Sequence, residues 1–122
     1  MCNPFAFGCC SLIGIESKIS SLVYTLNFLG VRTRASCQGH ITNWHYSFPW
    51  VCIEKKDFDL AERIIDQYND ASRFEWTISL HESTKEWLLQ PVLVNQPLEL
   101  LHEEVLKLTR YLLRRQAKKE RL

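Results

Sequence analysis

The sequence predicts an α+β domain in which helices cover one face of a mostly antiparallel sheet. Two units, each a helix followed by a hairpin, succeed one another and are followed by a last helix, giving the order α-β-β-α-β-β-α. The length of 122 residues fits one domain, and a composition of 46% hydrophobic and 24% charged residues is typical of a globular chain. We therefore expect a single domain spanning residues 1–122.

The first unit is predicted from the spacing of its apolar residues. Between Leu12 and Leu29 they recur at helical intervals, and Gly30 closes the run. The next residues alternate like a strand, which places Arg32 and Arg34 on one face. The predicted elements are, in order, a helix to residue 29, a strand over 31–36, a loop over 37–49 and a strand over 50–54.

The second unit and the last helix follow from capping and alternation signals. Asp57 is a good N-cap residue for the second helix, and Pro91 predicts that the returning strand of the second hairpin is an edge strand or is bulged. Pro97 suits the first turn of a long last helix. The predicted elements are a helix over 58–69, strands over 74–80 and 87–94, and a final helix with an apolar stripe at Leu98, Leu101, Val105, Leu108 and Leu112.

The two ends of the chain differ from the rest. Residues 1–10 predict an N-terminal arm, and residues 114–122 predict a basic helix end beyond the apolar stripe. Residues 107–122 hold seven basic side chains and one acidic side chain. Such asymmetry can indicate an RNA partner held through its phosphates, or a solvated helix end whose cations complement the helix dipole.

Cysteine usage indicates the compartment. Five cysteines, an odd number without regular spacing, favour a reducing environment over a disulfide framework. The first residues lack the basic start and the apolar core of a signal peptide. No apolar run approaches the roughly 18 residues of a membrane span. We expect a cytoplasmic protein that does not act in the membrane.

The run Ser36-Cys37-Gln38-Gly39-His40 is the predicted functional site. It ends a strand and opens into a loop, a position where a rigid scaffold displays accessible groups. Gly39 predicts a backbone angle or a close approach that a Cβ would prevent. Cations, hydroxyls and flat rings surround the run, and nucleotide sites are assembled from such groups. The predicted ligand-binding residues are Arg32, Arg34, Ser36, Gln38, Gly39, Trp44 and Trp50.

Two kinds of chemistry fit this run. Cys37, His40 and His45 are three zinc-type ligands, and Cys52 on the next strand could be a fourth. In the other hypothesis, Cys37 is a nucleophile whose thiolate pairs with His40, or His40 acts as an acid–base catalyst. The catalytic candidates are thus Cys37 and His40.

Several segments resemble the wybutosine-synthesising tRNA methyltransferase family. They are Leu26-Asn27-Phe28-Leu29, Thr33-Arg34-Ala35-Ser36-Cys37-Gln38-Gly39-His40-Ile41 and Trp50-Val51-Cys52-Ile53. Small uncharacterised bacterial and phage proteins with a Ser-Cys-x-Gly-His motif and a later Pro-Trp-Val are also similar. Membership of the methyltransferase family would imply S-adenosylmethionine and a tRNA guanosine derivative as ligands.

The sequence leaves the function open. One hypothesis is a binding module whose Ser36–His40 loop recognises a small ligand, RNA or a protein. A second is an RNA-modifying enzyme that uses a nucleotide or S-adenosylmethionine, and a third is a zinc-binding protein. A fourth makes the loop a hydrogen-bonded turn that pins two strands. Exposure of Cys37 and His40 in a pocket would favour a ligand site, whereas their burial under Trp44 and Trp50 would favour the turn.

Overall fold

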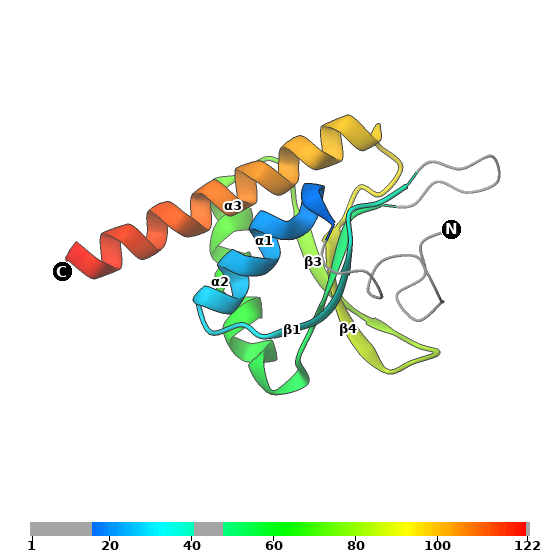
Figure 1. Ribbon diagram of the computed structural model, residues 1–122, viewed down its shortest axis with the longest axis horizontal. Coiled ribbons are helices and arrows are strands. Elements are labelled where there is room, and N and C mark those ends of the chain that lie inside the picture. The colour runs from blue at the N-terminus through cyan, green and yellow to red at the C-terminus, as the bar shows by residue number, and fades with distance from the viewer. Residues whose placement is uncertain (1–15, 41–47, 122) are drawn as a thin grey trace.

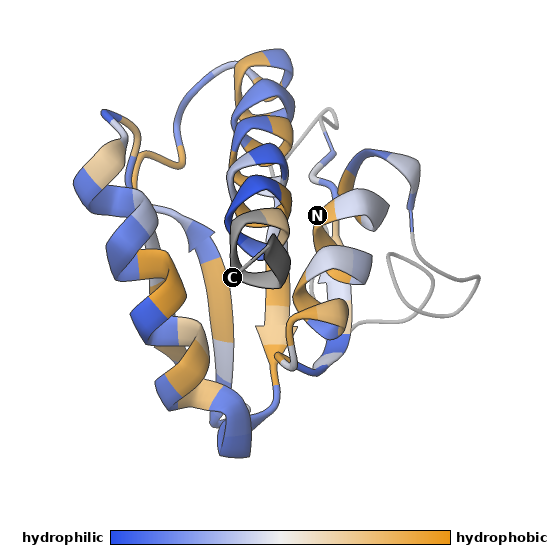
Figure 2. Ribbon diagram, turned by 90° about the vertical axis from the view of Figure 1, so that its left-hand side faces the viewer, coloured by the Kyte–Doolittle hydropathy of each residue, from blue (hydrophilic) through white to orange (hydrophobic). Residues whose placement is uncertain are grey.

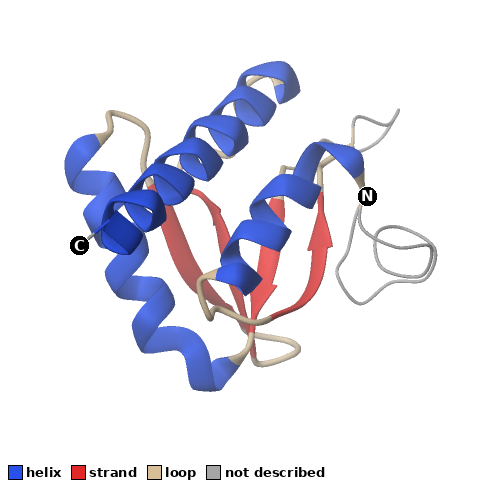
Figure 3. Ribbon diagram, turned by 60° about the vertical axis from the view of Figure 1, so that its left-hand side comes forward, coloured by secondary structure: helices blue, strands red, loops and turns tan. Residues whose placement is uncertain are grey.

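The computed structural model describes residues 16–40 and 48–121, with side chains up to residue 117. Three helices lie on one face of a four-stranded antiparallel sheet with the strand order β1-β2-β4-β3, which confirms the predicted α+β class and element order (Figure 1, Figure 3). The elements are α1 (Ser17–Phe28), β1 (Thr33–Cys37), β2 (Trp50–Ile53), η1 (Lys55–Asp57), α2 (Phe58–Ala71), β3 (Trp76–His81), β4 (Glu86–Pro91) and α3 (Leu98–Arg121).

The core lies between the helices and the sheet face that they cover. The strand register places Val51 of β2 opposite Leu89 of β4, which in turn lies opposite Ile78 of β3. The predicted stripe of α3 packs on this face, and four of its five residues are fully buried, namely Leu101, Val105, Leu108 and Leu112. In Figure 2 the helices carry both hydrophilic and hydrophobic segments, as burial of one side of each helix requires.

Two local sequence signals can be compared with the structure, namely Gly30 after α1 and Asp57 before α2. Gly30 follows α1 with a φ of +96°, as a helix-closing glycine should. Asp57 precedes α2 but makes no side-chain cap. Its carboxylate instead binds the backbone N–H of Arg32 at 3.0 Å and the guanidinium at 3.0 and 3.2 Å. Asp57 is thus the N-cap residue of α2 as predicted, but its side chain does not cap the helix, because the arginine supplies stronger donors.

The two predicted strand arginines do not share one face of a strand. Arg32 precedes β1, and the register shifts between Thr33 and Ala35, which is the signature of a β-bulge. Arg34 lies in this bulge and contacts Glu86 of β4 at 2.9 Å and Glu54 at 3.6 Å. These carboxylates lie on the sheet face that the helices leave open.

The prediction that Pro91 marks an edge strand or a bulge is wrong, since β4 lies inside the sheet and pairs regularly with β3. The proline is tolerated because it is the last residue of β4, beyond Leu89, the final residue paired with β2. Its missing N–H faces the side where β2 has already ended, so no ladder hydrogen bond is lost. An N–H is needed only where a neighbouring strand presents an acceptor.

Asn69 fastens the end of α2 to the start of β3. Its side chain accepts a hydrogen bond from the Trp76 N–H and donates one to the Trp76 C=O, each at 2.9 Å. Asn69→Ala is expected to lower the free energy of unfolding by about 1–3 kcal/mol, because both backbone groups lose their partner. Urea unfolding measures this, with Asp70→Ala on the same helix as an exposed control. Equal stability of the two variants would contradict the expectation.

No helix in the described part of the chain is both long and apolar enough to cross a membrane.

Candidate metal centre

The loop after β1 is fastened to the first turns of two helices. The Gln38 N–H donates to Glu16 Oε1 at 3.0 Å, and the Gln38 side-chain oxygen accepts from the Lys18 N–H at 3.0 Å. The Gln38 C=O lies 2.8 Å from Nε2 of His102 in α3. The end of β1 and the starts of α1 and α3 thus lie together at one end of the molecule (Figure 1). Gln38 holds all three in place.

Three potential metal ligands converge beside this junction. One ligand atom from each of Glu16, Cys37 and His40 lies within 4.8 Å of the other two. The His40 Nε2 is 2.9 Å from Glu16 Oε2, but the contact lacks hydrogen-bond geometry, and this buried nitrogen has no hydrogen-bond partner among the described residues. Buried polar atoms are rarely left unpaired. An imidazole nitrogen that faces a carboxylate oxygen without a hydrogen bond is the arrangement that a bound cation would complete.

The spacing of the three ligand atoms suits zinc. Zinc bonds of about 2.0–2.3 Å in a tetrahedral site place ligand atoms roughly 3.3–3.7 Å apart, so side-chain adjustments of about 1 Å suffice. Zinc is borderline soft and accepts sulfur, imidazole and carboxylate together. With Cys37 as thiolate and Glu16 ionised, two negative charges would balance a divalent cation.

Neighbouring backbone groups orient these ligands. The Gly39 N–H donates to the Cys37 Sγ at 3.4 Å, and the φ of Gly39 is +87°. A left-handed conformation here confirms the predicted need for glycine. This contact helps to hold the Cys37 sulfur in place. The Gln38 N–H likewise fixes one oxygen of Glu16 and leaves the other beside His40, the kind of outer support that metal ligands require.

The two described cysteines are in different chemical states. Cys37 is fully buried and disulfide-bonded, and the second cysteine of this bond is not among the described residues. Cys52 is a free, buried thiol. A disulfide sulfur is neither a thiolate ligand nor a nucleophile. Both the metal and the nucleophile hypotheses therefore concern the reduced form of Cys37.

Cys52 lies on the open face of the sheet, on the strand next to Cys37, and is electrostatically unsuited to ionise. Burial and the hydrogen bond that its thiol donates to Glu86 at 3.4 Å raise the pKa of Cys52 to about 12. An unfolded thiol ionises near pH 8.5. Between these values the unfolded chain holds fewer protons than the folded one, so stability falls as the pH rises.

Replacing Cys52 by alanine is expected to remove this part of the alkaline destabilisation. The thiol contributes a loss of up to about 1.4 kcal/mol per pH unit above roughly pH 8.5. Urea unfolding of the wild type and Cys52→Ala between about pH 7.5 and 10 measures the difference in slope. Parallel curves would show that the thiol ionises equally easily in both states.

The structure does not bring all of the predicted ligand-binding residues together. Arg32 and Arg34 are engaged with carboxylates, and Arg32 is six residues from Gln38, or about 20 Å along an extended chain. Ser36 and Trp50 are buried on opposite faces of the sheet. Trp44 and His45 lie outside the described residues. The Ser36–His40 segment therefore contacts the starts of α1 and α3, and its polar contacts are made by Gln38 and His40.

Sequence reasoning missed Glu16 and His102. They are 22 and 64 residues from Gln38, which both of them contact. Glu16 falls inside the helical run predicted between Leu12 and Leu29, whereas in the structure it is the N-cap residue of α1, where a carboxylate is favourable to the helix dipole. No spacing rule links it to Cys37.

The exposure of Cys37 and His40 does not favour one hypothesis alone. Cys37 is fully buried, as expected for a structural turn, whereas the side chain of His40 is 33% exposed, as expected for a ligand site.

A groove opens between the N-terminal turns of α1 and α3, beside the loop. Its volume of about 450 Å³ is within the range of small-molecule sites. Lys18 and His102, which hold Gln38, form part of its wall. The lining residues of this α1–α3 groove are Ser17, Lys18, Glu99, His102, Glu103 and Leu106.

No known protein family, curated protein or solved structure matches this chain. The resemblance to the wybutosine-synthesising tRNA methyltransferase family therefore stays a prediction.

Proposed function

We propose that this chain is a small metal-binding module that holds zinc through Glu16, Cys37 and His40 in its reduced state. The observation that carries the proposal is the convergence of these three ligand atoms within 4.8 Å, with the buried Nε2 of His40 facing Glu16 Oε2 at 2.9 Å without a hydrogen bond. Three protein ligands leave the fourth position of a tetrahedral zinc ion for water or for a bound ligand. The chain then supplies a rigid site with one exchangeable position.

Reduction controls whether Cys37 can bind the metal. Two molecules of a thiol reductant supply two electrons and two protons, the sulfur–sulfur bond breaks into two thiols, and the reductant becomes its own disulfide. The Cys37 thiol then gives its proton to solvent as its sulfur binds the cation. We infer that the protein works in the cytoplasm, where the glutathione pool maintains the thiol form.

Cobalt(II) substitution tests the ligand set. Cobalt(II) takes zinc's place in tetrahedral sites and gives a sulfur-to-metal charge-transfer band when a thiolate binds it. The reduced wild type is expected to show this band at one cobalt per chain, and Cys37→Ser to lose it. Cys52→Ser is the matched control, since Cys52 is also buried but lies outside the group. Loss of the band in both variants, or no band in the wild type, would overturn the proposal.

The volume of the α1–α3 groove favours a second candidate function, binding of a small molecule. Its wall carries the cation of Lys18 and the imidazole of His102 together with the carboxylates of Glu99 and Glu103, so a nucleotide-like compound with groups of both charges is the class expected. S-adenosylmethionine, which the resemblance implies, is the first compound to test. A rise in melting temperature with S-adenosylmethionine that Leu106→Trp abolishes would support this candidate, and no rise at millimolar ligand would count against it.

A further inference from the structure

The outer edge of β3 presents backbone groups that no described strand pairs with. Among the described strands, β3 ends the sheet and pairs only with β4. In an antiparallel pair, successive residues direct their N–H and C=O groups alternately toward the partner and away from it. The bond from the Val92 N–H to the Glu75 C=O, 3.1 Å long, fixes this alternation. The backbone groups of Trp76, Ile78 and Leu80 therefore point outward.

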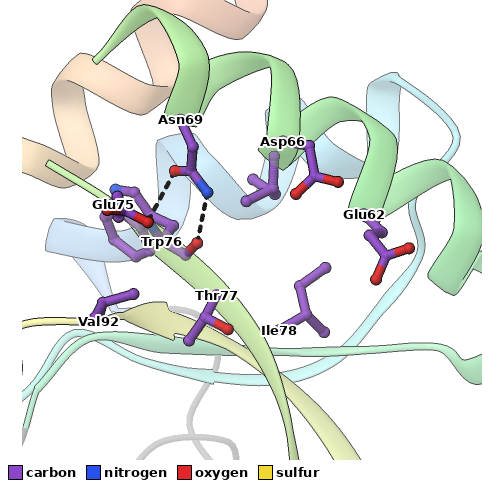
Figure 4. A pocket seen from close by; sticks show the side chains of 9 residues that line it. Glu62, Asp66, Asn69, Glu75, Trp76, Thr77, Ile78 and Val92 are labelled. Carbon is purple, nitrogen blue, oxygen red and sulfur yellow. Dashed lines mark hydrogen bonds between the residues drawn. The ribbon is translucent and has the colours of Figure 1, made fainter. Parts of the chain in front are cut away.

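Asn69 already satisfies the first of these positions in the way that a neighbouring strand would. Its side chain bonds both the N–H and the C=O of Trp76 at 2.9 Å, as Figure 4 shows. Within the described part of the chain, Ile78 and Leu80 have no equivalent partner for their outward groups. A row of open donors and acceptors thus begins where Asn69 stops, and such an edge is a template for a further strand.

A groove between α2 and β3 runs beside this edge. Its volume of about 220 Å³ is below the 300–1,000 Å³ or so of small-molecule sites and suits individual side chains. Figure 4 shows Glu62 and Asp66 reaching from α2 over the space beside the strand. The residues that line this α2–β3 groove are Glu62, Ile65, Asp66, Asn69, Glu75, Trp76, Thr77, Ile78 and Val92.

The groove is acidic and its charges are not neutralised internally. No ion pair involves Glu62, Asp66 or Glu75 within the described residues, although other carboxylates such as Asp57 are paired. Trp76, which is 2% exposed, adds a buried indole N–H without a partner among the described residues. The groove therefore combines open backbone groups with uncompensated negative charge.

We propose that the α2–β3 groove binds an extended basic peptide, which adds to the outer edge of β3 as a fifth strand. The backbone groups of Ile78 and Leu80 would bond the peptide backbone, and every second peptide side chain would face α2. Lysine or arginine at these positions would meet Glu62 and Asp66. A second copy of this chain fits less well, because pairing two β3 edges would bring like charges together. The proposal is independent of the metal centre.

The test is fluorescence anisotropy of the full chain with a labelled Lys-Thr-Lys-Thr-Lys-Thr peptide. Saturable binding is expected, and it should weaken at least about fivefold when Glu62→Gln and Asp66→Asn are combined. The matched control combines Glu99→Gln with Glu103→Gln, which removes the same charge from the α1–α3 groove. A Glu-Thr-Glu-Thr-Glu-Thr peptide should not bind.

Two N-methylated peptides separate strand addition from simple charge attraction. One peptide carries N-methyl groups at its odd-numbered residues, and the other carries them at its even-numbered residues. Strand addition predicts that one peptide loses at least about tenfold in affinity, since its β3-facing N–H groups are gone, while the other binds nearly unchanged. Equal binding of both, an equal effect of the control variant, or no saturable binding would overturn the proposal. So would a concentration-dependent dimer in sedimentation that excludes the peptide.

Discussion

A protein carrying His40→Ala is expected to bind zinc at least about 100-fold more weakly than the wild type when both are reduced. Loss of an outer-shell group typically costs 10–100-fold in metal affinity, so removal of one of three direct ligands should exceed that range. Competition with a chromophoric zinc chelator measures the difference.

His81→Ala is the matched control for this variant. His81 ends β3 and bonds Ser83 and Thr84 of the following turn through Nδ1, and it is not part of the ligand group. Its replacement should leave the zinc affinity within about twofold, since no ligand or supporting group is lost. A similar affinity in the wild type and in both variants would mean that zinc binds elsewhere or only at random.

Leu108→Ala is expected to cost about 2–5 kcal/mol of the free energy of unfolding. Leu108 is fully buried in the cluster between α3 and the sheet, so truncation removes packed apolar surface and leaves a cavity. Domains of this kind have only about 5–15 kcal/mol in total, so this substitution removes a large part of the stability of the domain.

Urea unfolding of Leu108→Ala beside Leu113→Ala tests this core directly. Leu113 lies on the same helix with 48% of its surface exposed, and its truncation should change stability by no more than about 0.5 kcal/mol. If the two variants lost the same free energy, the apolar stripe of α3 would not face the sheet.

The spacing of apolar residues predicted the fold, because burying one side of a helix or strand requires apolar residues at regular intervals. The α3 stripe is readable in the sequence, since residues at helical spacing meet one hydrophobic face, and four of its five predicted members are fully buried. Details that depend on distant partners were not readable. The Asp57 side chain binds Arg32 and makes no cap hydrogen bond to α2, and Pro91 occupies an inner strand only because β2 is shorter there.

Of the candidate site, only the two residues that are close in sequence, Cys37 and His40, were predictable. Cys37 and His40 are three residues apart at the end of one strand, so a spacing rule could pair them. Glu16 joins them only because α1 packs beside β1, which brings residues 21 positions or more apart into contact. The β3 edge carries no motif at all, because its property is the absence of a neighbouring strand in the sheet order.

The sheet order separates the two proposed sites. β1, which carries Cys37, and β3, whose outer side adjoins the α2–β3 groove, are the two opposite edges of the sheet. Variants at one site can therefore serve as folded controls for the other. Effects at residues this far apart are expected to add.

Native mass spectrometry of the wild type, recorded with equimolar zinc before and after treatment with a thiol reductant, tests the metal centre most directly. The reduced protein is expected to gain the mass of one zinc ion per chain, and the oxidised protein to remain metal-free, because only the reduced Cys37 offers a thiolate. A bare protein mass in both states, or equal zinc uptake in both, would contradict a metal centre formed by Glu16, Cys37 and His40.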